Sequence, residues 1–353
     1  MARRGQRGDR HGPADRRRPG DLGGDRGGGR AGPRPHGERR HRRARPARGH
    51  RRPEPALRRS DVSVPQRPVV AGVDASPEAA RAVALAVEEA GLRGAPLRLV
   101  HALSWPAADL TTSAGRLAGA VRRSAESLVA ETAAGAEAAL GAGRVGWEVR
   151  DGHPVEVLRA EGAGAQLLVV GSRGSGGLSG LLLGSTAGGV VLDAPCPVVV
   201  LPDETAVRAR DRRSVVVGVE GRPGDEEVLA VAFAAAAARG TDLVAVHAWQ
   251  DAALDTAFQS LGPVADWAGV LDAEERLLSE ALAGWHDKDP AVPVRELVVR
   301  DRTARALVAA ALGAQLLVVG HRRHRLARLG STTYGVLHRA GCPVAVVPLG
   351  GSR

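Results

Sequence analysis

The sequence is poor in aromatic residues, cysteine and lysine, and each shortage excludes a class of protein. Aromatic residues make up 2% of the 353 residues, so a folded core has to be built from Val, Leu and Ala. Cys196 and Cys342 are the only cysteines, too few for a disulfide framework or a cysteine metal cluster. The single lysine, Lys288, lies outside any G-x-x-x-x-G-K-[ST] pattern, which excludes P-loop phosphate binding.

Long apolar runs are also missing. No stretch approaches the roughly 20 apolar residues that a membrane-spanning helix needs. The N-terminal residues are Arg, Gly and Pro rather than the apolar segment of a signal peptide. We therefore expect a cytoplasmic protein with no membrane partner.

The positive charge is concentrated at the N-terminus. Residues 1–60 hold 20 Arg against 6 Asp and Glu, a balance of +14 in a chain of net charge +10, which leaves −4 for the remainder. Almost no apolar residues occur in this segment, so residues 1–66 are predicted to be a disordered tail. Three interpretations of the tail stay open: a nucleic-acid tether acting on phosphates, a solvated tail without a partner, and upstream sequence translated from a mis-called start. Because no aromatic residues are interleaved for base stacking, any nucleic-acid binding would lack sequence preference. We favour the last two interpretations, because 48 Arg against one Lys indicates a GC-rich genome, in which spurious reading frames encode Arg, Gly, Pro and Ala; a nucleic-acid partner is not expected.

An internal repeat organises the rest of the chain. Asp74 and Glu220 lie 146 residues apart, and the same spacing separates His101 from His247 and Cys196 from Cys342. The segment QLLVVG occurs twice with a spacing of 149. The sequence therefore predicts two domains at residues 67–203 and 213–350, joined by a linker at 204–212; these are called the first and second repeat below.

Within the first repeat, short apolar runs alternate with helical patterns. Strands are expected at 69–73, 97–102, 145–150, 166–170 and 197–201, and helices from Pro77 and at 116–140, 154–163 and 185–193. Ser76 before Pro77 is a good N-cap followed by a favoured first helical residue. Nearly continuous Val and Leu in the strands is typical of a parallel sheet covered on both faces. The fold class is α/β, with two doubly wound parallel-sheet sandwich domains of five strands each.

One segment of the first repeat carries a phosphate-binding pattern, LLVVGSRGSGGLSGLLLGSTAGG. Its glycines, Gly171, Gly174 and Gly184, allow the backbone to approach a ligand closely. Ser185 and Thr186 open a helix whose N-terminal N–H groups attract anions. Arg173 adds a cation for a charge-assisted contact.

These residues resemble the universal stress protein family. Its ATP-binding members carry Gly, two residues, Gly, nine residues, then Gly and Ser or Thr, and Gly171, Gly174, Gly184 and Ser185 match this spacing. The family's first strand ends in Asp, matched by Asp74, and its second ends in His and a small residue beside the adenine, matched by His101 and Ala102. The resemblance implies an adenine nucleotide α-hydrolase-like fold, ATP as the cofactor, with Mg²⁺ as an optional companion, and pairing of domains through their last strands.

The second repeat departs from that pattern. Arg323 stands where the second glycine belongs, and the loop to Gly330 is three residues shorter than in the first repeat. Glu220 replaces the aspartate. Arg322, Arg323, Arg325 and Arg328 form a basic loop, but we expect the ATP motif to be intact only in the first repeat.

The expected function is an ATP-binding, stress-related regulatory protein with slow hydrolysis at most. No catalytic residues are assigned, and no metal ligands are identified. Two alternatives stay open: an ATP-dependent transferase or pyrophosphatase of related fold, and an interaction scaffold that binds no nucleotide. The site residues expected to contact ATP are Asp74, Ala102, Gly171, Arg173, Gly174, Gly184, Ser185 and Thr186. Segments 197–201 and 343–347 are expected to pair inside the chain, and homodimers through the same strands are an open possibility.

Removal of the tail tests the prediction that it is not part of the folded structure. A chain that begins at Val62 is expected to melt within about 2 °C of the full chain, because the tail has almost no apolar residues to bury. Differential scanning calorimetry of the two chains measures this. A drop well beyond that limit would show that the tail packs on the folded part.

Overall fold

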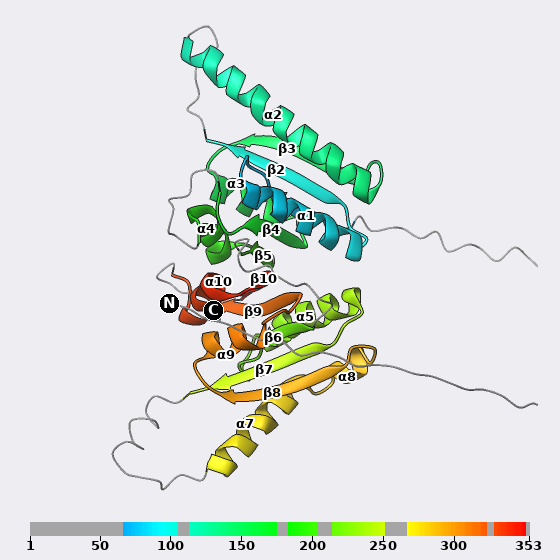
Figure 1. Ribbon diagram of the computed structural model, residues 1–353, viewed down its shortest axis with the longest axis vertical. Helices are drawn as coiled ribbons and strands as arrows, with labels where there is room; N and C mark the ends of the chain where they lie inside the picture. The colour runs from blue at the N-terminus through cyan, green and yellow to red at the C-terminus, as the bar shows by residue number, and fades with distance from the viewer. Residues whose placement is uncertain are drawn as a thin grey trace, which may run out of the picture. The chain divides into compact units, whose positions relative to one another are not determined.

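The computed structural model describes residues 66–104, 113–174, 183–202, 214–250, 267–322 and 328–350. The predicted disordered tail and the linker at 204–212 lie outside these residues. Strands and helices alternate through both repeats, as the sequence predicts (Figure 1).

The strands are short runs of β-branched and aliphatic residues. In the first repeat they are β1 (Val69–Gly72), β2 (Leu97–Leu103), β3 (Val145–Asp151), β4 (Leu167–Gly171) and β5 (Val198–Leu201). In the second repeat they are β6 (Val215–Gly218), β7 (Leu243–Trp249), β8 (Val294–Arg300), β9 (Leu316–Arg322) and β10 (Val344–Leu349). The bounds of the first five differ from the predicted ones by one or two residues, the usual uncertainty at element ends.

The described helices are α1 (Pro77–Leu92), α2 (Ser113–Leu140), α3 (Pro154–Gly162), α4 (Ser185–Asp193), α5 (Asp225–Arg239), α7 (Trp267–Leu282), α8 (Trp285–Lys288), α9 (Thr303–Ala310) and α10 (Ser331–Arg339). The helices of the first repeat match the predicted ones, except that α2 begins three residues before the predicted start at 116 and α3 ends one residue early. Ser76 caps α1: its hydroxyl accepts from the Ala79 N–H at 3.1 Å. The structure confirms the predicted α/β class.

The two sets of five strands form one continuous sheet. Among the described residues the order is β3-β2-β1-β4-β5-β10-β9-β6-β7-β8. Each half runs in the same order, which is that of a doubly wound fold with its switch point beside the first strand. All neighbours within a half are parallel, and β5 pairs with β10 antiparallel.

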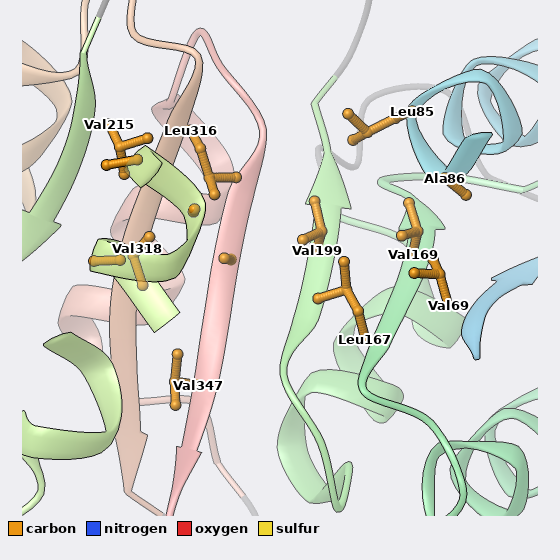
Figure 2. Packing of buried hydrophobic residues seen from close by; sticks show 14 of the residues in the cluster. Val69, Leu85, Ala86, Leu167, Val169, Val199, Val215, Leu316, Val318 and Val347 are labelled. Atoms are coloured by element: carbon orange, nitrogen blue, oxygen red, sulfur yellow. The ribbon is translucent and has the colours of Figure 1, made fainter. Parts of the chain in front are cut away.

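Alternate strand residues face opposite layers of helices, so the core has two parts. Val69 and Leu167 belong to the cluster that packs on α1, α2, α5 and α7. Val70 and Leu168 belong to the cluster that packs on α3, α4, α9 and α10. Figure 2 shows side chains of the first cluster in both repeats, with Val199 of β5 and Val347 of β10 among them. Each cluster therefore continues across the junction of the repeats.

The junction of β5 and β10 is symmetric in sequence. Val199 pairs with Ala345, and these residues are equivalent positions, 146 apart. Val198 pairs with Val346 and Val200 with Val344, which are the reciprocal contacts of a two-fold interface. Extending this register places Cys196 and Cys342 roughly six residues, or about 20 Å, apart along the strands. A disulfide needs Cα atoms within about 7 Å.

Neither cysteine forms a disulfide, and both are buried. Burial raises the pKa of the Cys196 thiol to about 11, because the thiolate would lose its hydration. A thiol with this pKa stays protonated near neutral pH and is a poor nucleophile. Cys196 is therefore an unreactive residue of the core.

A buried ion pair joins the two repeats beside this junction. Glu89 of α1 is fully buried and contacts Arg239 of α5, whose side chain is 4% exposed. The other Glu89 oxygen lies 3.0 Å from Arg93 on its own helix. Arg93 and Arg239 are equivalent positions, whereas Ala235 occupies the second repeat's equivalent of Glu89. A single carboxylate therefore serves two symmetry-related arginines.

The asymmetry favours pairing of unlike repeats. Two second repeats paired in the same way would bring two Arg239 side chains together without a carboxylate. Uncompensated buried charge costs several kcal/mol. The arrangement therefore stabilises a contact between one first repeat and one second repeat.

Glu89→Ala is expected to destabilise the protein by about 3–5 kcal/mol, because it leaves two arginines facing each other. Arg239→Ala is expected to cost less, because Glu89 keeps its contact with Arg93. Urea unfolding followed by circular dichroism measures both, and a double-mutant cycle gives their coupling.

Glu88→Ala is the matched control, since Glu88 is the exposed neighbour on the same helix. A surface carboxylate contributes at most about 1 kcal/mol. Equal losses for Glu88→Ala and Glu89→Ala would contradict the assigned role of Glu89.

Candidate functional site

The first repeat gathers its predicted site residues at the carboxyl ends of β1, β2 and β4. β1 lies between β2 and β4, so the chain leaves β1 in one direction and returns on its other side. Ligands in open α/β sheets bind outside the strand ends at such a switch point. Asp74 follows β1, Ala102 lies near the end of β2, and Gly171 ends β4.

Gly174 lies directly against Asp74. A Cβ atom placed on Gly174 would come within 2.6 Å of the Asp74 Oδ2. The φ angle of Gly174 is outside the left-handed region, so space rather than backbone conformation requires glycine here. The Asp74 Oδ1 accepts from the Ser76 N–H at 2.9 Å and from the Ser76 hydroxyl. Asp74 therefore helps to order the start of α1 while its second oxygen faces the glycine loop.

Gly184 closes the loop onto the start of α4. Its N–H donates to the Ser172 carbonyl at 2.6 Å. A Cβ on Gly184 would lie 3.2 Å from the same carbonyl oxygen and 3.3 Å from the Arg173 Cα. Ser185 and Thr186 then form the first turn of α4, and no side chain caps that helix. The first-turn N–H groups are thus available at the mouth of the loop. Residues 175–182 of the motif lie outside the described residues.

Arg173 has a partner within the protein, and its predicted contact with phosphate stays a prediction. Its guanidinium lies 3.4 Å from the Glu78 carboxylate, in the first turn of α1. Gly171 explains how α1 comes so close, because a Cβ there would lie 3.0 Å from the Glu78 Cβ and 3.1 Å from its backbone. An incoming anion would compete with Glu78 for this cation.

His101 has a structural contact that links two strand ends. Its Nδ1 lies 2.8 Å from the Val73 carbonyl, and Ala102 follows it on β2. The contact holds the end of β2, where Ala102 lies, against the end of β1, which Asp74 follows. His247 repeats it in the second repeat, with Nδ1 at 2.9 Å from the Val219 carbonyl.

Sequence reasoning missed Ser172. This residue is 1% exposed, and its hydroxyl has no hydrogen-bond partner among the described residues. A buried hydroxyl without a partner is costly, and a bound polar ligand or a water satisfies it. The sequence signal for Ser172 was its position between Gly171 and Arg173, which are both predicted to contact ATP, as is Gly174 after them.

The second repeat lacks the loop geometry of the first. β9 continues through His321 and Arg322, which pair with Pro348 and Leu349 of β10. The first repeat turns away at the equivalent point, after Gly171. Arg322 donates to the Pro223 carbonyl at 2.8 Å. The strand extension removes the backbone turn that would surround phosphates; residues 323–327 lie outside the described part of the chain.

Asp225 orders the neighbouring loop of the second repeat. Its carboxylate accepts from the Gly221 N–H at 2.7 Å, the Arg222 N–H at 3.1 Å and the Glu220 N–H at 3.3 Å. The position of Asp225 is the start of α5, where a carboxylate also complements the helix dipole. The loop between β6 and α5 is thus closed on itself through the Asp225 carboxylate.

A large cleft is nevertheless found in the second repeat. Its volume is about 1710 Å³, and it begins at the ends of β6 and β7, beside Glu220 and His247. His247 Nε2 lies 2.9 Å from the Glu274 carboxylate of α7 within it. The cleft then extends over the first turns of α9 and α10.

Comparison with known proteins decides the family. The profile of the universal stress protein family matches residues 66–202 and again residues 211–348. The chain belongs to the universal stress protein family. It contains two family domains in tandem, as the internal repeat predicted.

Relatives of this universal stress protein match most of its length. Universal stress protein Rv2005c of Mycobacterium tuberculosis is 38% identical over 293 residues, which is 80% of this chain and 97% of the relative. A solved universal stress protein from Archaeoglobus fulgidus shares the fold at 19% identity, with a TM-score of 0.60 over 81% of this chain and 99% of that one. A shorter one, solved in complex with cAMP, is 27% identical and covers 39% of this chain and 97% of its own, with a TM-score of 0.31.

Neither a membrane-spanning helix nor a metal-ligand cluster is found among the described residues. No helix among them combines the length and apolarity that a membrane crossing requires. No group of three or more His, Cys, Asp or Glu side chains in the same residues is placed to hold a metal ion. The cytoplasmic location and the Mg²⁺ companion of ATP stay predictions.

Asp225→Asn is expected to lower the stability of this universal stress protein by about 1–3 kcal/mol. The amide group would turn one N–H donor toward the loop N–H groups, which then lose an acceptor. Thermal unfolding of the full chain measures the loss. Glu226→Gln, at the exposed next position of α5, is the control and is expected to change little. An unchanged melting temperature for Asp225→Asn would show that the loop is ordered by other contacts.

Proposed function

We propose that the first repeat binds ATP and that the protein works as a nucleotide-dependent regulator. The observation that carries this is the glycine cradle, where Gly174 lies against Asp74 and Gly184 against Ser172. A Cβ at either glycine would crowd its neighbour, the Asp74 carboxylate or the Ser172 carbonyl, so a side chain there would displace the loop backbone. Backbone N–H groups and a helix N-terminus at such a place favour phosphate oxygens.

The residues of the cradle fit a nucleotide. The loop Gly171–Gly174 and the first turn of α4 would hold the phosphates through N–H groups, with Ser172, Ser185 and Thr186 supplying hydroxyls. Asp74 and Ala102, at strand ends held together by His101, would lie toward the nucleoside. Arg173 would exchange Glu78 for phosphate. ATP supplies a transferable phosphoryl group, and the chain's residues described above bind and orient it.

The second repeat is proposed to have a supporting role toward ATP. Its strand extension and its self-closed loop remove the cradle.

The transferase or pyrophosphatase alternative predicts release of pyrophosphate or a transferred group. The scaffold alternative predicts no nucleotide affinity, so one binding measurement separates it from the proposal.

Self-association through the last strands is proposed to be internal. β5 has β4 on one side and β10 on the other, so neither of its edges is open for a second chain. Closed edges also protect the Val-rich strands from aggregation. A homodimer through the same strands would require the two repeats to separate.

Gly174→Val is expected to weaken ATP binding at least tenfold, a loss of about 1.4 kcal/mol, because its side chain would press on the Asp74 carboxylate and displace the loop. Isothermal calorimetry on the full chain measures this. Thermal shift gives a second readout, since a ligand at 100 times its dissociation constant stabilises by about 2.7 kcal/mol.

Gly146→Val is the matched control, since a Cβ on Gly146 meets open space on the exposed strand β3. It should bind ATP like the wild type. Equal affinity in the Gly174→Val and wild-type chains would reject the cradle, and no ATP affinity in the wild type would reject the proposed function.

A further inference from the structure

The cleft of the second repeat has an arm that runs away from the strand ends. It follows the contact between α9 and α10 as far as Leu312. We call this arm the α9/α10 groove, lined by Arg305, Val308, Ala309, Leu312, Tyr334 and Arg339. Gly335 allows the two helices to approach, since a Cβ there would lie 2.8 Å from the Ala304 Cβ.

The first repeat has a different surface at the equivalent place. Glu156 and Asp193 occupy the positions of Arg305 and Arg339, with the spacings of 149 and 146 found elsewhere in the repeat. Arg159, the equivalent of Val308, forms an ion pair with Asp193 at 2.8 Å across α3 and α4. A pocket of about 360 Å³ remains there, lined by Glu156, Arg159 and Asp193 among others. The second repeat has replaced acids and an ion pair with arginines and an apolar floor.

An aromatic ring stands over the groove. Tyr334 is 54% exposed, in a chain with few aromatic residues, and its position in the first repeat is taken by Gly188. The ring lies 4.0 Å from the His338 ring at an angle of 44°, so His338 supports one side of it. Leu312 is 68% exposed at the far end. Exposed apolar and aromatic side chains in one groove suit the flat face of a ligand.

The charge in the groove is positive but moderate. Arg305 forms an ion pair with Asp301 at 2.9 Å, one turn away on the helix start. Arg339 is exposed at the end of α10, at the other side of the apolar floor. Two guanidinium groups, one of them shared with Asp301, match a ligand with one anionic group better than a triphosphate.

The geometry points to a second ligand site: we propose that the α9/α10 groove binds a small molecule with one aromatic ring and one anionic group, a carboxylate or a phosphate. The ring would stack on Tyr334 above Val308 and Leu312, and Arg339 and Arg305 would meet the anion. Small-ligand pockets usually measure about 300–1,000 Å³, and the whole cleft is larger, so the groove and the strand ends can hold separate ligands. The site is independent of ATP binding by the first repeat.

Saturation-transfer NMR on the full chain tests the site with phenyl phosphate and benzoate as probes, one for each anion. Methyl phosphate, which has no ring, measures the contribution of stacking. We expect saturable binding of at least one aromatic probe and at least tenfold weaker binding of methyl phosphate. Tyr334→Ala and Arg339→Asp should each weaken the aromatic probe at least fivefold, whereas Tyr334→Phe should keep its affinity.

Arg159→Ala is the matched control, because it breaks the ion pair of the equivalent place in the first repeat and should leave probe binding unchanged. ATP calorimetry on the same variants should give wild-type affinity, so failure here is distinct from failure of the proposed function. Melting curves show whether a variant has lost its fold. If Tyr334→Ala does so, the affinities of the folded Tyr334→Phe chain for the aromatic probe and for methyl phosphate are compared instead. The proposal is overturned if neither aromatic probe binds, if methyl phosphate binds equally well, or if the folded Arg339→Asp chain keeps wild-type affinity.

Discussion

The antiparallel pairing of β5 with β10 is the contact on which the arrangement of the two repeats depends. It turns two five-stranded sheets into one sheet and joins each core cluster across the junction. Because the equivalent residues Val199 and Ala345 pair with each other, the contact has approximate two-fold symmetry. Such a contact could equally form between two chains, so something else has to favour the internal pair.

Glu89 supplies that preference. The two repeats carry the same arginine beside the junction, as Arg93 and Arg239, but only the first repeat carries the carboxylate. Because buried charge needs a partner, this one substitution between near copies favours unlike pairing. The linking of the repeats in one chain adds a high effective concentration in the same direction.

Once paired, the repeats are free to diverge at their ligand-facing ends. The first keeps a glycine loop that turns away after Gly171, and the second continues the strand through Arg322. The stabilising contact lies at the last strands, whereas the clefts lie at the carboxyl ends of the other strands. Changes at the strand ends therefore leave the junction intact. The repeats also differ along α10, where the second has Tyr334 and Arg339 at the positions of Gly188 and Asp193 in the first.

The sequence by itself determined the repeat, the α/β class, the strand positions and the glycine spacing, because periodicity and motif spacing are local properties of the chain. It did not determine that Arg173 lies on Glu78, that Ser172 is buried without a partner, or that Asp225 closes the loop of the second repeat. Those depend on which helix packs against which strand end. The Glu89 pair and the α9/α10 groove were equally hidden, since their residues lie 150 and about 30 positions apart and meet only through the sheet order. Tertiary structure decided them because distance in space, unlike spacing in sequence, is set by packing.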